Sequence, residues 1–183
     1  VPVPVTAMRV SYVGELGWEL HLSSDHLLQV YEALMANVRK VGGCQFGSYA
    51  LNAMRIEKGY HGWGADFGTE YTLFDAGLNR FATMNKGDFV GRAAVVSHAG
   101  QEAEWEWIGL EITEDSPEPM GSDPILKDGE WVGYVTSCSH GYRTGKHCVL
   151  GYVKRGSVQM GAPCDVRVLG RLTAALRHST HVY

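Results

Sequence analysis

The stretch PILKDGEWVGYVTS, residues 124–137, decides the fold class of the C-terminal half. Apolar and polar residues alternate on both sides of Asp128 and Gly129, as is typical of strands with one buried face. Asp-Gly is favoured in the two-residue type I′ turn, because both positions of that turn need a positive φ. The stretch therefore predicts a β-hairpin that turns at Asp128 and Gly129.

Further short runs of the same kind surround this hairpin. EWIGLEI precedes it, VLGYV follows it, and CDVRVLGRLTAALR adds two runs that meet at Gly170. Several short strands at this spacing favour a small antiparallel barrel or sandwich. We expect a small antiparallel β-barrel over residues 102–183.

Residues 1–101 show a mixed pattern instead. RVSYV and WELHL predict two strands joined by the glycine-bounded GELG, and a short strand is expected at residues 79–84. A helix with Leu27, Tyr31, Leu34 and Val38 on one face should end at Gly42 and Gly43. The predicted class is α+β, with a boundary near residues 100–104.

A second helix is expected from Ser48 to about Lys58, with Gly59 as its C-terminal glycine. Ala50, Leu51, Met54 and Glu57 should lie along one side of this helix. The stretch KGDFVGRAAVVSHAG predicts a turn and a short helix that Gly100 stops.

Composition excludes several protein classes. The chain has 183 residues and a net charge of -4, without the basic face of a nucleic-acid-binding protein. No apolar run approaches the ~20 residues of a membrane span, and VPVPV is no signal peptide. We expect no nucleic-acid or membrane partner, and a cytoplasmic location, or the mitochondrial matrix in a eukaryote.

Motifs for metal and dinucleotide binding are missing from the sequence. The four cysteines form no CxxC pair, and the histidines form no HxH or HExxH. No GxSxG, GxGxxG or GxxxxGK[ST] occurs either. We expect no metal site and no flavin-binding turn in this chain.

Three stretches combine glycine, aromatic and charged residues: residues 11–20, 50–67 and 76–92. In the first, Tyr12 and Glu19 flank a glycine-bounded turn on two expected strands. If they share a face, they offer a ring beside a carboxylate, which can accept two parallel N–H bonds from a planar heterocycle such as a pterin. The alternative is a solvated glutamate and a half-buried tyrosine.

In the second stretch, Arg55 and Glu57 lie two positions apart on a helix and should point in different directions. Arg55 could bind an anionic tail or pair with a nearby acid. His61 lies in a glycine-rich loop, where a surface or hydrogen-bonded role is commoner than catalysis.

Together these stretches resemble the glycine cleavage T-protein (aminomethyltransferase) family. YVGELGWEL resembles its Tyr-x-Gly-Glu-x-Gly-x-Glu signature, and MRIEKGYHGWGADF resembles the segment that follows it. AGLNRF and KGDFVGR resemble its third conserved stretch, and the order matches over about residues 7–92. GELGWEL and HGWGAD look closer to sarcosine and dimethylglycine dehydrogenases, so we expect a truncated aminomethyltransferase-like domain at residues 1–101.

The resemblance implies roles for individual residues. Glu19 matches the glutamate that grips the pterin ring, Tyr12 the tyrosine beside the ligand, and Arg55 the arginine near the folate. Asp66 matches a Gly-x-Asp position to which we assign a structural role. The family's catalytic Asp lies upstream of the signature, and no Asp precedes Tyr12 here. We therefore assign no catalytic residue.

The implied function is tetrahydrofolate-dependent one-carbon transfer in an intact parent protein, with this chain inactive alone. Tetrahydrofolate is the expected cofactor, and FAD is expected only if an upstream flavin domain exists. A missing N-terminal or flavin domain is the expected partner, since neither end of the chain resembles a natural terminus. The alternatives are a non-catalytic interaction module and a related folate-dependent demethylase.

Overall fold

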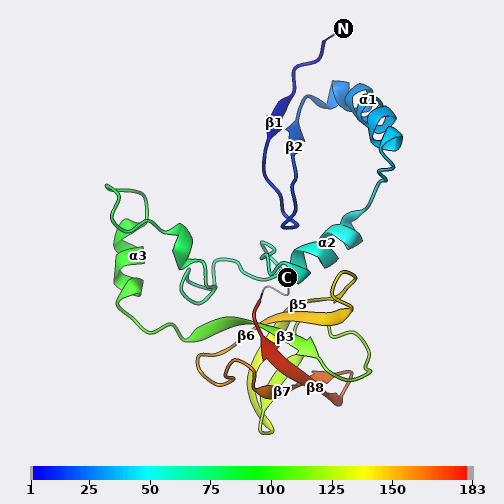
Figure 1. Ribbon diagram of the computed structural model, residues 1–183. Coiled ribbons are helices and arrows are strands. Elements are labelled where there is room, and N and C mark those ends of the chain that lie inside the picture. Colours follow the sequence, from blue (N-terminus) through cyan, green and yellow to red (C-terminus); the bar gives the residue numbers. More distant parts are fainter. Residues whose placement is uncertain (1, 181–183) are drawn as a thin grey trace.

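The computed structural model describes residues 2–180 and shows a mixed α+β segment followed by a closed β-barrel (Figure 1). The α+β class predicted from the sequence is confirmed. The helices are α1 (Leu27–Lys40), α2 (Ser48–Glu57) and α3 (Arg92–Ala99), with 3₁₀ turns at Ser24–His26 and Asn79–Phe81. The strands are β1 (Thr6–Met8), β2 (Glu19–His21), β3 (Trp105–Ile112), β4 (Pro124–Lys127), β5 (Glu130–Gly141), β6 (Lys146–Lys154), β7 (Pro163–Val168) and β8 (Arg171–His178).

The barrel is antiparallel at every pairing, in the order β3-β6-β5-β4-β7-β8, and closes where β3 pairs with β8. The predicted hairpin joins β4 to β5, and its turn residues Asp128 and Gly129 have φ values of 53° and 85°. Leu169 and Gly170 make a second turn with two positive φ values between β7 and β8. Closure removes the exposed sheet edges, so the short strands need no further partner.

Inward-pointing aliphatic side chains fill the barrel. The buried cluster consists mainly of valine, isoleucine and leucine, and includes Ile108, Leu110, Ile125, Val135, Val149, Val153 and Val166. Branched residues dominate because alternate positions of each strand must interdigitate in a narrow interior.

Helix α2 packs on the outside of the same barrel, as Figure 1 shows. Ile56 is fully buried against Cys148 and Leu150 of β6, with Trp107 of β3 beside them. Cys148 and Leu150 alternate with the inward-pointing Val149, so β6 is buried on both faces. This explains why β6 is apolar along most of its length.

The buried side of α2 only partly matches the side named from the sequence, residues 50, 51, 54 and 57. The buried residues of the helix are Ala53, Arg55, Ile56 and Glu57, while Leu51 is 36% exposed. Apolar spacing alone misjudged the face because two charged side chains are buried with specific partners. Beyond the helix, Tyr60 and Gly59 donate to the carbonyls of Arg55 and Ile56, so Gly59 ends the helix as predicted.

The N-terminal hairpin is shorter than expected. β1 spans Thr6–Met8, whereas the predicted strand RVSYV at residues 9–13 does not form, and residues 12–16 make bends. In the register, Glu19 pairs with Met8, so Tyr12 and Glu19 are not neighbours across two strands. Tyr12 instead lies in the connection between β1 and β2, in which Gly14 has a φ of 72°.

Helix α1 has no buried residue. Leu27, Tyr31 and Leu34 of its predicted apolar face are 59%, 44% and 44% exposed. The helical spacing was predicted correctly, but no part of residues 2–180 covers this face.

Residues 79–84 do not form the predicted strand. Phe81 donates to the Leu78 carbonyl and Ala82 to the Asn79 carbonyl, which closes a 3₁₀ turn. A three-residue apolar alternation is too weak a signal to specify a strand without a ladder partner. Helix α3 ends at Gly100 as expected. Among residues 2–180, no helix is long and apolar enough to cross a membrane.

Candidate functional site

The three stretches singled out in the sequence line one cleft of about 400 Å³. Tyr12 comes from the first stretch, residues 59–61 and Phe67 from the second, and Leu78, Arg80 and Phe81 from the third. Aromatic rings therefore form most of the wall, with one guanidinium at its side. Such a cleft suits a flat, conjugated ligand that carries a polar or anionic group.

Tyr12 is held in the cleft by its hydroxyl, which donates to the backbone carbonyl of His61 at 2.5 Å. Its ring lies 6.3 Å from that of Tyr60, and 39% of the residue remains exposed. Partial burial raises the pKa of the Tyr12 phenol, so the hydroxyl stays protonated as the donor. The ring is thereby fixed with part of its surface open to a ligand.

His61 supports the floor of the cleft. Its ring stacks on Trp107 of β3 with centroids 3.5 Å apart, and Nε2 donates to the Ala76 carbonyl at 2.9 Å. Burial lowers the pKa of His61 to about 4, so the ring is neutral at pH 7. Because a carbonyl can only accept, the proton of the neutral ring lies on Nε2. These contacts give His61 a structural role.

Behind the cleft, Arg55 forms a buried ion pair with Asp66. The side chains are 5% and 0% exposed. Asp66 also accepts from the Gly62 amide at 2.7 Å and from the Thr136 hydroxyl at 2.5 Å. The structural role expected for Asp66 agrees with these bonds, which join the loop to the barrel.

Arg55 uses most of its donors inside the protein. Nε donates to Asn52 at 2.9 Å, Nη1 to the Tyr60 carbonyl at 3.0 Å, and Nη2 to Ser137 at 2.7 Å. With the Asp66 bond, four of the five guanidinium N–H groups are engaged. Of the two possibilities left open by the sequence, the structure shows the pairing with a nearby acid.

Glu19 lies apart from the residues that line the Tyr12 cleft. Its carboxylate is 3.3 Å from Nε2 of His21, and both side chains are about half exposed. The Glu15 side chain is 49% exposed and pairs with Arg143 of the β5–β6 turn. The structure thus places Tyr12 in the cleft, Arg55 behind it and Glu19 on the adjoining hairpin.

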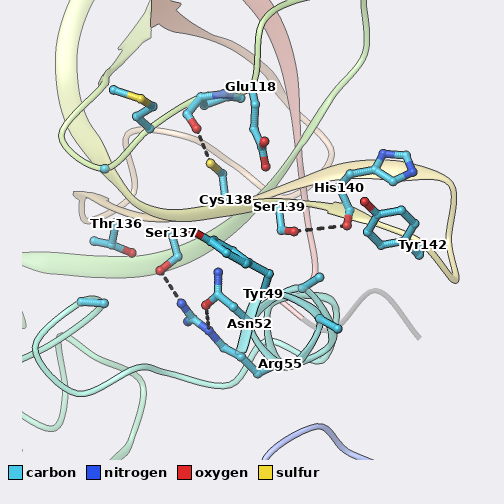
Figure 2. Close-up of a pocket in the computed structure, with 16 residues that line it drawn as sticks. Tyr49, Asn52, Arg55, Glu118, Thr136, Ser137, Cys138, Ser139, His140 and Tyr142 are labelled. Atoms are coloured by element: carbon cyan, nitrogen blue, oxygen red, sulfur yellow. Dashed lines mark hydrogen bonds between the residues drawn. The ribbon is translucent and has the colours of Figure 1, made fainter. Parts of the chain in front are cut away.

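A second, larger hollow of about 990 Å³ lies between α2 and β5 (Figure 2). Ser137, Asn52 and Arg55 form a hydrogen-bonded row on one side of it. Tyr49 and Tyr142, which also line it, are 94% and 82% exposed. Arg55 is therefore shared between the hollow and the network behind the Tyr12 cleft.

Metal ligands do not cluster anywhere in the described chain. Within residues 2–180 no group of three or more His, Cys, Asp or Glu side chains could hold a metal ion. The residues that line the Tyr12 cleft offer hydrogen bonding, stacking and charge pairing to an organic ligand.

Two protein-family models match this chain, one in each half. The GCVT N-terminal domain model matches residues 2–86, and the glycine cleavage T-protein C-terminal barrel model matches residues 106–183. The chain belongs to the glycine cleavage T-protein family. The second match coincides with the closed barrel, and the first contains the Tyr12 cleft.

Within this family, the T-protein-like chain resembles proteins of different names. It is 35% identical over 170 residues to mitochondrial dimethylglycine dehydrogenase of Mus musculus, covering 92% of this chain and 20% of that protein. It is 31% identical over 163 residues to the mitochondrial pyruvate dehydrogenase phosphatase regulatory subunit of Mus musculus, covering 86% and 18%.

A solved structure of the family has the same fold. The crystal structure of glycine cleavage system aminomethyltransferase T from Bartonella henselae matches with a TM-score of 0.85 and 24% identity. The match covers 94% of this chain and 48% of that one. The T-protein-like chain thus spans about half of that structure and about a fifth of the dehydrogenase.

Several residues of the T-protein-like site were not singled out from the sequence. From the sequence, Thr136 and Ser137 are only part of a predicted strand, and Trp107 is only part of the run EWIGLEI. Arg80 and Phe81 lay within the quoted third stretch, and that was the available signal. The contacts of Thr136 and Ser137 left no pattern in the sequence, because their partners lie about 70 and 82 residues away.

Proposed function

We propose that this chain is the folate-binding portion of a protein that transfers a one-carbon unit to tetrahydrofolate from an N-methylated glycine derivative. One observation carries the proposal: the three family stretches, distant in sequence, line a single aromatic cleft. The similarity to a dimethylglycine dehydrogenase supports the choice of donor class.

In this proposal Tyr12 packs beside the pterin ring, and Glu19 accepts two parallel N–H bonds from its edge. Glu19 is on a short hairpin and half exposed, so its carboxylate is available once it leaves His21. Arg55 does not bind the anionic tail of the folate directly in this proposal. With four N–H groups engaged, it holds the loop that carries Tyr60 and Asp66 against the barrel.

Tetrahydrofolate is the proposed cofactor, and the aromatic cleft fits a planar ring system. FAD belongs to the proposal only if an upstream flavin domain exists in the same protein. Such a flavin would supply the two-electron oxidation of an N-methyl group, and tetrahydrofolate held by Tyr12 and Glu19 would accept the one-carbon unit. The matching location is the cytoplasm, or the mitochondrial matrix in a eukaryote, since the dehydrogenase relative is named as mitochondrial.

The chain by itself should not complete the transfer. No Asp precedes Tyr12, whereas the family's catalytic Asp lies upstream of the signature. General acid–base catalysis contributes typically ~10²–10⁴ in rate, so its loss alone would be measurable. Formation of 5,10-methylenetetrahydrofolate by the purified 183-residue chain would contradict this part of the proposal.

The site is tested by titrating tetrahydrofolate into the full-length parent carrying Glu19→Gln. The substitution keeps the shape but removes the charge and replaces one acceptor with a donor. Hydrogen bonds to a charged group contribute ~1.5–3 kcal/mol, so affinity should fall by roughly 10–150-fold. Glu15→Gln is the matched control, because Glu15 pairs with Arg143. Equal losses in both variants, or none at Glu19, would refute the assignment.

A second candidate is a non-catalytic interaction module. The exposed apolar face of α1 and the similarity to a protein named as a regulatory subunit favour it. Absence of folate binding by the intact, folded parent would select this reading. A related folate-dependent demethylase would instead bind folate and be distinguished by its methyl donor.

A further inference from the structure

Arg80 occupies a distinctive position in the Tyr12 cleft. It is the one Lys or Arg among the residues that line the cleft. Its guanidinium carbon lies 4.9 Å from the centre of the neighbouring Phe81 ring. Stacking on a ring face orients a guanidinium and leaves its edge N–H groups free to donate.

Arg80 has no carboxylate within ion-pair distance in residues 2–180. Within that range, the arginines that pair with side-chain carboxylates are Arg55, Arg143, Arg171 and Arg177. Arg80 is also exposed, unlike Arg55, so a ligand can reach it without breaking a protein contact.

The remainder of the cleft wall carries no competing charge. Tyr12, Tyr60, Phe67 and Phe81 contribute rings, and His61 is neutral at pH 7 because burial holds its pKa near 4. A ligand in the cleft therefore meets one positive charge beside aromatic surfaces. That combination selects an aromatic group joined to an anion by a short link.

We propose that Arg80 binds a carboxylate of the ligand's tail while the aromatic part of that tail packs against Tyr12 and Phe81. The inference rests on the proposed function and deepens it. In a reduced folate, the groups concerned are the glutamyl carboxylate and the p-aminobenzoyl ring. Arg80 is then a specificity residue that distinguishes folates from pterins without this tail.

The test titrates p-aminobenzoyl-L-glutamate and its neutral diethyl ester into the 183-residue chain. Binding is measured from the NMR chemical shifts of the protein. We expect saturable shifts at Tyr12, His61 and Phe81 with the acid. The ester should bind roughly fivefold more weakly, since an exposed ion pair contributes up to ~1 kcal/mol. Arg80→Gln should bind acid and ester equally, and Arg80→Lys should retain part of the preference.

Arg39→Gln, which removes an exposed arginine of α1, is the control and should leave the preference unchanged. Equal affinity of the unmodified chain for acid and ester, or no saturable shifts at the cleft, would overturn the inference. Tetrahydropterin, which lacks the tail, separates the two proposals in the full-length parent. If Glu19→Gln leaves the affinity for tetrahydropterin unchanged while binding of p-aminobenzoyl-L-glutamate still depends on Arg80, the proposed function alone is wrong. If the affinity for tetrahydropterin depends on Glu19 while Arg80→Gln leaves the preference for acid over ester unchanged, the inference about Arg80 alone is wrong.

Discussion

Thr136 and Ser137 are consecutive residues of β5, yet both hydroxyls bind the same buried ion pair. Thr136 donates to Asp66 at 2.5 Å, and Ser137 accepts from Arg55 at 2.7 Å. In a regular strand their side chains would point to opposite faces. The pairing register between β5 and β6 shifts between Val135 and Ser137, so the strand is irregular at this point.

The irregularity has the character of a β-bulge, which re-aims side chains next to functional sites. Here it lets one strand satisfy both partners of the ion pair, which come from α2 and from the loop after it. The barrel thereby fixes the segment that carries Tyr60 and His61. The shape of the Tyr12 cleft consequently depends on β5, although no β5 residue lines it.

Asp66→Asn should strongly destabilise the chain. The change leaves the buried Arg55 guanidinium without its counter-charge, and breaking one side of a buried pair costs about 3–5 kcal/mol. Urea unfolding followed by circular dichroism measures the free energy of unfolding. Glu15→Gln, which breaks an exposed pair with Arg143, should cost less than about 1 kcal/mol. Similar losses in both variants would contradict a buried, barrel-anchored pair.

Stability should fall as the pH drops from about 6.5 to about 4, in part because of His61. Burial lowers its pKa from 6.5 to about 4, so in this window the unfolded chain takes up a proton that the folded chain does not. The contribution is complete above pH 6.5. A pKa shift corresponds to ~1.4 kcal/mol of stability per pKa unit in a fully buried group. Because the His61 ring is partly exposed, we expect a smaller total loss than this conversion gives, on the order of 1–2 kcal/mol.

Unfolding midpoints in urea at several pH values measure this effect, with His61→Phe as the comparison. Phe keeps a ring that can stack on Trp107 but does not titrate. The variant should show a flatter profile between pH 4 and 6.5. Asp75 and Glu106, whose pKa values are lowered by hydrogen bonds against the effect of burial, lose their contributions at lower pH. An unchanged slope in His61→Phe would show that other groups cause the dependence.

Gly59→Ala should destabilise the chain more than Gly129→Ala. Both glycines have positive φ values, 67° and 85°, so both substitutions carry backbone strain on the order of 1 kcal/mol. A Cβ at Gly59 would also overlap the Thr180 carbonyl, whereas nothing lies within 4 Å at Gly129. Thermal and urea unfolding of the two variants measure the difference. Equal losses would mean that the segment at Thr180 yields to the added methyl group without cost.

The sequence by itself determined the elements whose signals are local. The Asp128-Gly129 turn, the alternation around it and Gly59 at the end of α2 were each predicted, because turn geometry and periodicity involve neighbouring residues. The family resemblance also depended on linear motifs, and it directed attention to Tyr12 and to the third stretch, which line the same cleft.

The tertiary structure alone decided how those pieces combine. The buried face of α2, the end of β1 at Met8 and the 3₁₀ turn at Asn79–Phe81 all differ from the sequence expectation. The first of these depends on partners outside the helix: Arg55 is buried because Asp66 and Ser137 satisfy its guanidinium. Burial of a charge is favourable only where such partners converge, and local spacing carries no information about that convergence.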